Sequence, residues 1–125
     1  MVSETKKLIR YLIIGGLAAA THFSVAWLAI HARSGIAPFA AALGFSAGFI
    51  VSLVGHHSFT FKSNQKMHVV APKMAVIAIF GISYNAILVQ ALLIIGIGTD
   101  LAILAGIATT PLANYILMRL WVFRV

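Results

Sequence analysis

The chain has 125 residues, of which 62% are hydrophobic and only 9% are charged. Soluble domains carry about 25% charged residues, so this composition excludes an ordinary water-soluble domain and predicts a chain that folds in a membrane. The formal net charge is +7, and the absence of cysteine excludes disulfides, thiol chemistry and thiolate metal sites.

Four long apolar stretches follow one another along the chain. They cover roughly residues 8–30, 37–55, 74–97 and 101–118, and each is near the length of about 20 residues that a membrane-spanning helix needs. A helix satisfies its own backbone groups in hydrocarbon, and the stretches lack the alternating pattern of a transmembrane barrel. We therefore predict an all-α integral membrane protein with four transmembrane helices in a single domain over residues 1–125.

The start of the chain also has some features of a signal peptide, because Lys6, Lys7 and Arg10 precede an apolar run. That run continues to residue 30, which is longer than the usual apolar region of about 7–15 residues in a signal peptide. We therefore favour a first helix that remains part of the protein.

Basic residues are concentrated on one side of the predicted helices. Only Arg33 lies on the other side. The eight remaining Lys and Arg residues flank the first helix, occupy the central loop or follow the fourth helix: Lys6, Lys7, Arg10, Lys62, Lys66, Lys73, Arg119 and Arg124. Because cytoplasmic loops carry an excess of Lys and Arg, both termini and the central loop are predicted to be cytoplasmic. This bias explains most of the net charge and leaves nucleic-acid binding without support.

The chain contains an internal repeat. Residues 52–62 correspond to residues 114–124 at an offset of sixty-two, and the first and third apolar stretches correspond at an offset of sixty-three. The repeats run from about 7 to 62 and from about 70 to 124, and each is predicted to be a helical hairpin. Because each hairpin crosses the membrane twice, we predict parallel repeats, unlike the inverted repeats of many ion-coupled carriers.

Small residues recur at every fourth position along the second and fourth stretches. The two stripes are Ala40, Gly44, Gly48, Ser52 and His56, and Ala102, Gly106, Thr110, Asn114 and Met118. Small side chains let helices approach closely, so we predict that the two stripes pack against each other. The alternative is that Gly44 and Gly48 mark a surface for a homo-oligomer.

Polar side chains inside the apolar stretches are the first candidates for substrate contacts. His22 lies near the middle of the first stretch, and its partner in the third is Asn85. Both are interpreted either as hydrogen-bonded contacts between helices or as groups that line a substrate path. Ser52 and Asn114 lie about one turn inside the predicted cytoplasmic boundary of their helices.

Cations at that boundary are the second set of candidates. Arg119 suits bidentate contact with a phosphate, whereas His57, its repeat partner, acts only when protonated or as a single donor. The alternative for Arg119, Arg10 and Lys73 is an ordinary anchor on lipid phosphates. The aromatic residues that interleave with Lys62 and Arg124 are predicted to form a membrane-interface belt, with docking of a partner or lipid as the alternative: Phe59, Phe61, Trp121 and Phe123.

Patterns for catalysis or metal binding are missing. The two acidic residues, Glu4 and Asp100, lie outside the apolar stretches, so no carboxylate is placed in the membrane for proton coupling. The neighbouring His56 and His57 cannot share one helical face, and no third ligand has helical spacing to them. We expect neither an enzyme nor a metal site nor a cofactor.

Several of these residues together resemble the GtrA-like family. They are Arg10-Tyr-Leu-Ile-Ile-Gly-Gly16, His22, residues 52–61, Asn85 and the ending Asn114-x4-Arg119-x-Trp121-Val-Phe-Arg124. The resemblance covers nearly the whole chain and implies a multi-pass protein of the bacterial cytoplasmic (inner) membrane that acts in cell-surface polysaccharide synthesis. It implies a proposed flippase of sugars carried on undecaprenyl phosphate or another polyprenyl phosphate. One departure is that the family usually has arginine where His57 stands.

The resemblance also implies two protein partners. A polyprenyl-phosphate glycosyltransferase loads the sugar, and an outer-face glycosyltransferase uses it. The leading hypothesis is therefore a translocase, and the alternative is a non-transporting partner that recruits or anchors the first enzyme. A small drug exporter would need a membrane-embedded glutamate in the first span, which is absent. The candidate contacts with the lipid phosphate and sugar are Arg119, Asn114, Asn85, His22, Ser52, His57, Arg10 and Lys73.

Overall fold

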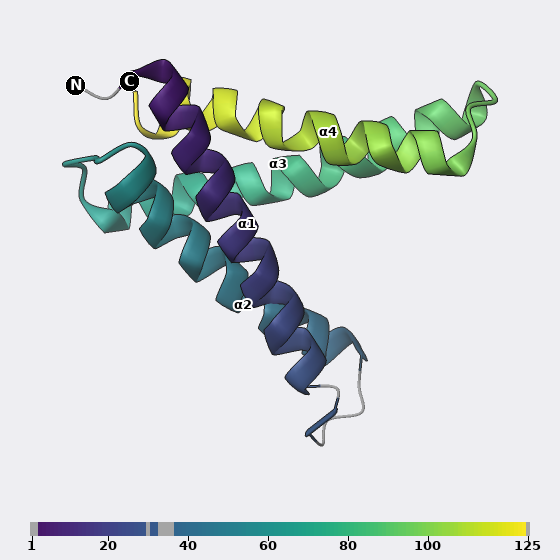
Figure 1. Ribbon diagram of the computed structural model, residues 1–125, viewed down its shortest axis with the longest axis horizontal. Coiled ribbons are helices and arrows are strands. Elements are labelled where there is room, and N and C mark those ends of the chain that lie inside the picture. Colours follow the sequence, from purple (N-terminus) through teal and green to yellow (C-terminus); the bar gives the residue numbers. More distant parts are fainter. Residues whose placement is uncertain (1–2, 30, 33–36, 125) are drawn as a thin grey trace. The chain divides into compact units, whose positions relative to one another are not determined.

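The computed structural model describes residues 3–29, 31, 32 and 37–124, and its elements there are helices (Figure 1). The long helices are α1 (Glu4–Ala29), α2 (Ala37–Gly55), α3 (Met67–Ile94) and α4 (Thr99–Leu117). A five-residue π-helix continues α2 as η2 (His56–Thr60), and another continues α4 as η3 (Met118–Val122). Among the described residues, four helices are long and apolar enough to cross a membrane, which confirms the predicted fold class. Arg33 lies outside the described residues, so its placement on the side of the membrane opposite the other basic residues stays a prediction.

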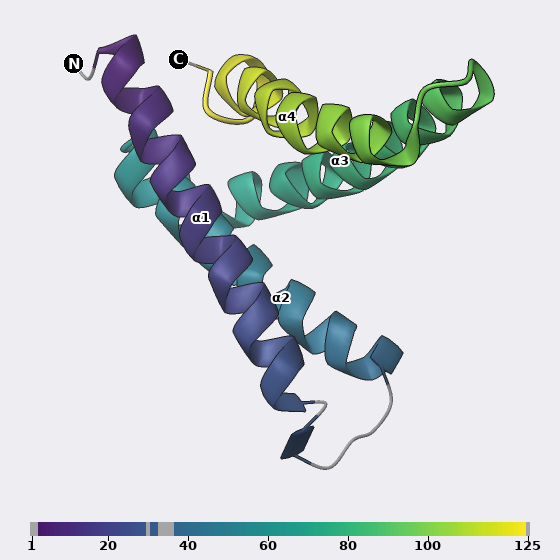
Figure 2. The same cartoon turned by 45° about the vertical axis from the view of Figure 1, so that its right-hand side comes forward.

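The helices pair into two hairpins, each of which is a compact unit. The first hairpin contains α1, α2 and η2 and ends at Asn64, and the second begins at Gln65 and contains α3, α4 and η3. In both views the two helices of a hairpin run side by side along most of their length (Figures 1 and 2). The interface inside each hairpin therefore positions the polar residues that the sequence singled out.

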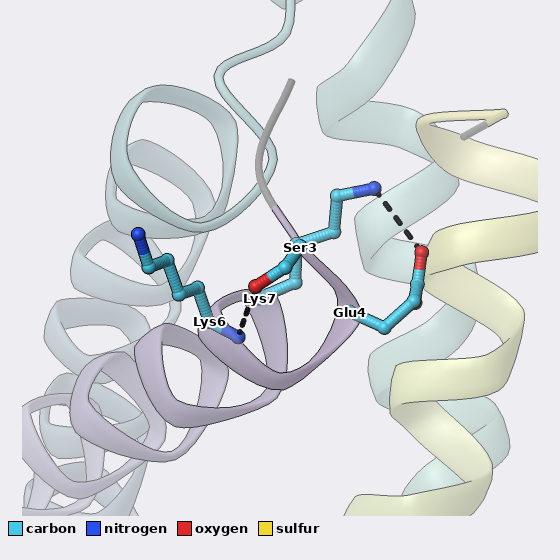
Figure 3. A network of polar contacts seen from close by, with 4 residues as sticks. All are labelled: Ser3, Glu4, Lys6 and Lys7. Atoms are coloured by element: carbon cyan, nitrogen blue, oxygen red, sulfur yellow. Dashed lines mark hydrogen bonds and ion pairs between the residues drawn. The ribbon is translucent and has the colours of Figure 1, made fainter.

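α1 begins with a capped first turn. The Ser3 Oγ accepts a hydrogen bond from the Lys6 N–H at 3.3 Å, and the Lys7 Nζ lies 3.4 Å from the Glu4 Oε1 (Figure 3). A serine at this position satisfies one of the amide groups that have no partner inside the helix. A carboxylate in the first turn also interacts favourably with the helix dipole. The helix therefore begins at Glu4, before the predicted apolar stretch.

α3 also begins before its predicted stretch. The second repeat was predicted to begin at about residue 70, but the helix starts at Met67 and includes Pro72 and Lys73. Val70 is fully buried, so the first turns of the helix already contribute to packing. Pro72 lies in the second turn, where it has no N–H to donate to the His68 carbonyl, and the helix nevertheless continues through it. Pro72 and Lys73 interrupt the apolar stretch in the sequence, but the helix continues through both residues.

Both hairpins end in the same local backbone. η2 and η3 start sixty-two positions apart, and the N–H groups of Phe61 and Phe123 close the two π-turns at 3.0 and 2.8 Å. Lys62 and Arg124 follow, and each has a φ of +47°. Residues other than glycine rarely adopt this left-handed conformation. The sequence predicted matching ends for the two hairpins, but not a π-turn followed by a left-handed cation.

Each stripe of small residues packs inside its own hairpin. A Cβ added at Gly44 would lie 2.5 Å from the His22 carbonyl oxygen, and one at Gly48 would lie 2.9 Å from another α1 carbonyl. A Cβ at Gly106 would lie 2.5 Å from the Asn85 Oδ1. The prediction that the two stripes pack against each other is wrong, because the preceding helix occupies the space over these glycines. For the same reason the Gly44 and Gly48 face is not an open surface for a homo-oligomer.

Candidate functional site

A cation lies over an aromatic ring at the end of each hairpin. The Arg10 guanidinium carbon is 5.0 Å from the Phe59 ring centroid, and its Nη1 donates to the Phe59 carbonyl at 3.2 Å. At the corresponding place in the second hairpin, the Lys73 Nζ is 5.8 Å from the Trp121 ring centroid. Such contacts contribute about 0.5–1 kcal/mol at exposed sites. They fix two predicted site residues in place and leave further N–H donors for an anion.

His57 and Arg119 occupy the second position of η2 and η3, and both are partly exposed. The two hairpins therefore present different groups at the same point of the same backbone. A guanidinium is always charged and matches a phosphate with two parallel donors. An imidazole offers at most one donor when it is neutral. At this position the second hairpin therefore presents the better phosphate ligand.

His56 is a feature whose role the sequence did not indicate. Its side chain is 1% exposed, its Nδ1 lies 3.0 Å from the Thr60 Oγ1, and its ring stacks on Tyr11 with centroids 4.9 Å apart. The ring edge also meets Phe61, at 6.5 Å between centroids. The corresponding positions of the second hairpin are apolar: Met74, Met118 and Val122. A buried polar cluster therefore stabilises the first hairpin only, and the four-residue spacing of His56 and Thr60 was the available sequence signal.

Thr60→Val is expected to lower the free energy of unfolding by about 1–3 kcal/mol, because it leaves the buried His56 Nδ1 without its partner. Thr21→Val is the matched control. The Thr21 hydroxyl donates to the Leu17 carbonyl of its own helix at 2.8 Å, so its loss leaves no side chain unsatisfied. Reversible unfolding in mixed detergent micelles measures the free energy of unfolding of the two variants. Equal losses in the two variants would contradict a stabilising role for the cluster.

Three polar side chains lie along the interface of the second hairpin. The Asn85 side chain of α3 covers Gly106, and the Asn114 side chain of α4 covers Gly81, where a Cβ would lie 2.8 Å from the Asn114 Nδ2. Thr110 is one helical turn from both Gly106 and Asn114 on α4. We call Asn85, Thr110 and Asn114 the polar seam. The structure thus places two predicted site residues in one interface and adds Thr110, which the sequence had treated only as part of the stripe.

The corresponding interface of the first hairpin is less polar. The His22 side chain lies against Gly44 and meets the Phe45 ring edge-on, at 6.2 Å between centroids. His22 is nevertheless exposed overall, and Ser52 is partly exposed. Gly48 stands where the second hairpin has Thr110. His22 and Asn85 therefore occupy equivalent places over a glycine of the partner helix, while a path that they share is still a prediction.

Metal-binding geometry is missing from the described residues, where no group of three or more His, Asp or Glu side chains could hold an ion. The second hairpin instead has cations near its end and neutral hydrogen-bonding groups further along the membrane span. Lys73 and Arg119 supply the cations, and the polar seam supplies the neutral groups. This arrangement can bind an anion that is joined to a neutral polar group.

A family model described as the GtrA/DPMS transmembrane domain matches residues 10–123. The chain belongs to this family. The match includes both cation–aromatic pairs and the whole polar seam, and it confirms the resemblance predicted from the sequence. Searches of curated proteins and of solved structures gave no match. Membership of the GtrA/DPMS family gives the chain a role in polysaccharide synthesis related to lipid-linked sugars, as a multi-pass membrane protein.

Proposed function

We propose that this GtrA/DPMS domain translocates a polyprenyl-phosphate-linked monosaccharide, such as a sugar on undecaprenyl phosphate, across the bacterial cytoplasmic membrane. The observation that carries the proposal is the order of groups along the second hairpin. Arg119 and the Lys73–Trp121 pair stand at its end, and the polar seam lies further along the same interface. A lipid-linked sugar whose sugar enters the hairpin ahead of its phosphate presents hydroxyl groups to the polar seam and the phosphate to these cations.

The barrier to translocation lies in the head group, because the prenyl chain stays in hydrocarbon throughout. A charge at the centre of a bilayer costs at least about 2.5–3.5 kcal/mol, and unpaired hydroxyl groups add to that cost. Fixed cations and neutral polar side chains lower the barrier by replacing water at the phosphate and the sugar. A gradient of lipid-linked sugar, loaded inside by one glycosyltransferase and consumed outside by another, supplies the direction without an intramembrane carboxylate.

Leaflet exchange in reconstituted vesicles tests the proposal. Purified protein is incorporated into vesicles that contain undecaprenyl-phosphate glucose, galactose or mannose, and the lipid in the outer leaflet is sampled over time with a sugar-oxidising reagent that does not cross the membrane. We expect faster exchange of at least one lipid than in protein-free vesicles. Exchange no faster than in protein-free vesicles for all three lipids would reject translocation.

Single cysteines report the proposed orientation, because the native chain has none. Asn64→Cys lies in the loop between the hairpins, and Gly98→Cys lies in the loop between α3 and α4. In intact cells a membrane-impermeant maleimide is expected to label Gly98→Cys and to leave Asn64→Cys unlabelled until the cells are opened. The reverse pattern would place the termini outside and contradict the proposed direction of transport.

A second candidate function is a non-transporting partner that anchors a polyprenyl-phosphate glycosyltransferase. Phe59 and Trp121 are 41% and 39% exposed beside their cations, which favours a docking surface at the hairpin ends. This function predicts that Arg119→Ala disrupts co-purification of the glycosyltransferase, while His22→Ala and Asn85→Ala leave polysaccharide modification intact. Loss of modification in the last two variants, with co-purification retained, favours translocation instead.

A further inference from the structure

The polar seam contains two buried oxygen atoms that form no hydrogen bond within the described chain. They are the Thr110 Oγ1 and the Asn114 Oδ1. The neighbouring Thr109 behaves differently, because its hydroxyl donates to the Ala105 carbonyl at 2.7 Å. An unsatisfied buried polar group is costly, and the bond that Thr109 makes shows that α4 can satisfy a threonine hydroxyl. The seam therefore carries a hydrogen-bonding capacity that its own packing does not use.

The geometry of the interface presents these oxygens together with a third polar group. Gly106 and Asn114 are eight residues apart, which is about 12 Å of helix, and Thr110 stands midway between them on the same face. The Asn85 Oδ1 would lie 2.5 Å from a Cβ at Gly106, and the Asn114 Oδ1 would lie 3.0 Å from a Cβ at Gly81. Both amides thus lie directly on glycine backbone. The glycines create the room in which three neutral polar groups line one seam.

The chemistry of these groups selects the ligand. A prenyl or acyl chain has no donor for the Asn114 Oδ1, and an ionised phosphate diester has acceptors only. A hydroxyl group both donates and accepts, so it can satisfy an amide oxygen and a threonine hydroxyl at once. The first hairpin has Gly48 and Ser52 where the second has Thr110 and Asn114. Its interface lacks the threonine hydroxyl and both amides, since His22 stands where the second hairpin has Asn85.

We infer that the polar seam is a hydroxyl-binding site inside the membrane, formed by the second hairpin alone, that holds the sugar of the lipid-linked cargo. The inference rests on the proposed function for the identity of the cargo. It assigns Arg119 and Lys73 to the phosphate and the seam to the sugar. Water is the other source of hydroxyl groups that fits the same atoms, and the experiment separates the two.

Lipid affinity measured on purified protein in nanodiscs tests the inference. The probes are bare undecaprenyl phosphate and undecaprenyl-phosphate glucose, galactose and mannose. The native protein is expected to bind at least one glycosylated lipid about 5-fold or more tightly than the bare lipid, because one neutral hydrogen bond contributes about 1 kcal/mol. Thr110→Val is expected to remove about 5-fold of that preference and to leave affinity for the bare lipid unchanged. Asn114→Ala should reduce the same preference.

Thr109→Val is the matched control, because it removes an adjacent hydroxyl that is already bonded within α4. It should leave the preference for the glycosylated lipid intact. Thermal unfolding of each variant is measured alongside, and Thr110→Val should be as stable as the native protein or more so, since it removes an unsatisfied group. A stabilised Thr110→Val protein with an unchanged preference shows that the seam holds water or nothing and overturns the inference. A native protein without any preference overturns it also.

Leaflet exchange, measured on the same protein preparations, tests the proposed translocation separately from the sugar site. Rapid exchange by the native protein, with a preference that neither seam substitution alters, rejects the sugar site and leaves translocation standing. A preference that depends on Thr110 and Asn114, in a protein that does not accelerate exchange, retains the sugar site and rejects translocation.

Discussion

Gly44→Ala is expected to lower the free energy of unfolding of the protein by about 1–3 kcal/mol. The added Cβ would lie 2.5 Å from the His22 carbonyl oxygen, 2.7 Å from the His22 Cδ2 and 2.9 Å from the Ala26 Cβ. A side chain can rotate away from such a contact, but a helix carbonyl cannot. The substitution therefore forces α1 and α2 apart, and the change is measured by reversible unfolding in mixed micelles followed by tryptophan fluorescence.

Gly15→Ala is the matched control for this substitution. It lies in the same hairpin, in α1, where a Cβ would meet nothing within 4 Å. Alanine is a better helix former than glycine by about 0.5–1 kcal/mol, so this variant should be as stable as the native protein or slightly more so. The two glycines thus predict effects of opposite sign. Similar stability for the two variants would refute the close approach of α1 to Gly44.

Arg119→Ala is expected to slow leaflet exchange of the lipid-linked sugar by about 10- to 100-fold. Hydrogen bonds to a charged group contribute about 1.5–3 kcal/mol, and each 1.4 kcal/mol corresponds to a factor of ten. Arg119→Lys keeps the charge but loses the paired donors, so an intermediate rate is expected. Initial rates in reconstituted vesicles measure both variants against the native protein.

Lys66→Ala is the control for the loss of a positive charge. Lys66 is exposed and immediately precedes the first turn of α3. Its removal changes the net charge by the same amount as Arg119→Ala without touching either hairpin end. We expect the exchange rate to stay near that of the native protein. If Lys66→Ala slows exchange as much as Arg119→Ala does, general attraction of the anionic lipid explains the effect better than a specific phosphate contact.

The elements of the fold were predictable because the bilayer leaves few choices for an apolar chain. Any stretch of about 20 apolar residues must become a helix there, whatever its detailed sequence. The helix starts were predicted less well. The Ser3 cap extends α1 beyond the apolar run, and the burial of Val70 extends α3 across Pro72 and Lys73. Local capping and packing decide these boundaries, and hydropathy alone does not report them.

The candidate site was predictable in composition but not in geometry. The repeat pattern paired His22 with Asn85, and in the structure both lie over a glycine of the partner helix. It predicted that the small stripes of α2 and α4 pack against each other, whereas each packs against the other helix of its own hairpin. A pattern of small residues indicates a close helix contact but does not identify the helix on the other side. The unused oxygens of Thr110 and Asn114 are a property of side-chain orientation. Residue identity could not reveal it.

The π-turns at the two hairpin ends control which way the last side chains face. Each π-turn places one residue more in the turn than an α-helix would. Successive residues of a helix are rotated by about 100°. Deleting one residue ahead of Phe59 in η2, or ahead of Trp121 in η3, would therefore turn everything beyond it by about that angle, and would swing Phe59 off Arg10 or Trp121 off Lys73. The length of these five-residue segments, more than their composition, keeps each ring under its cation.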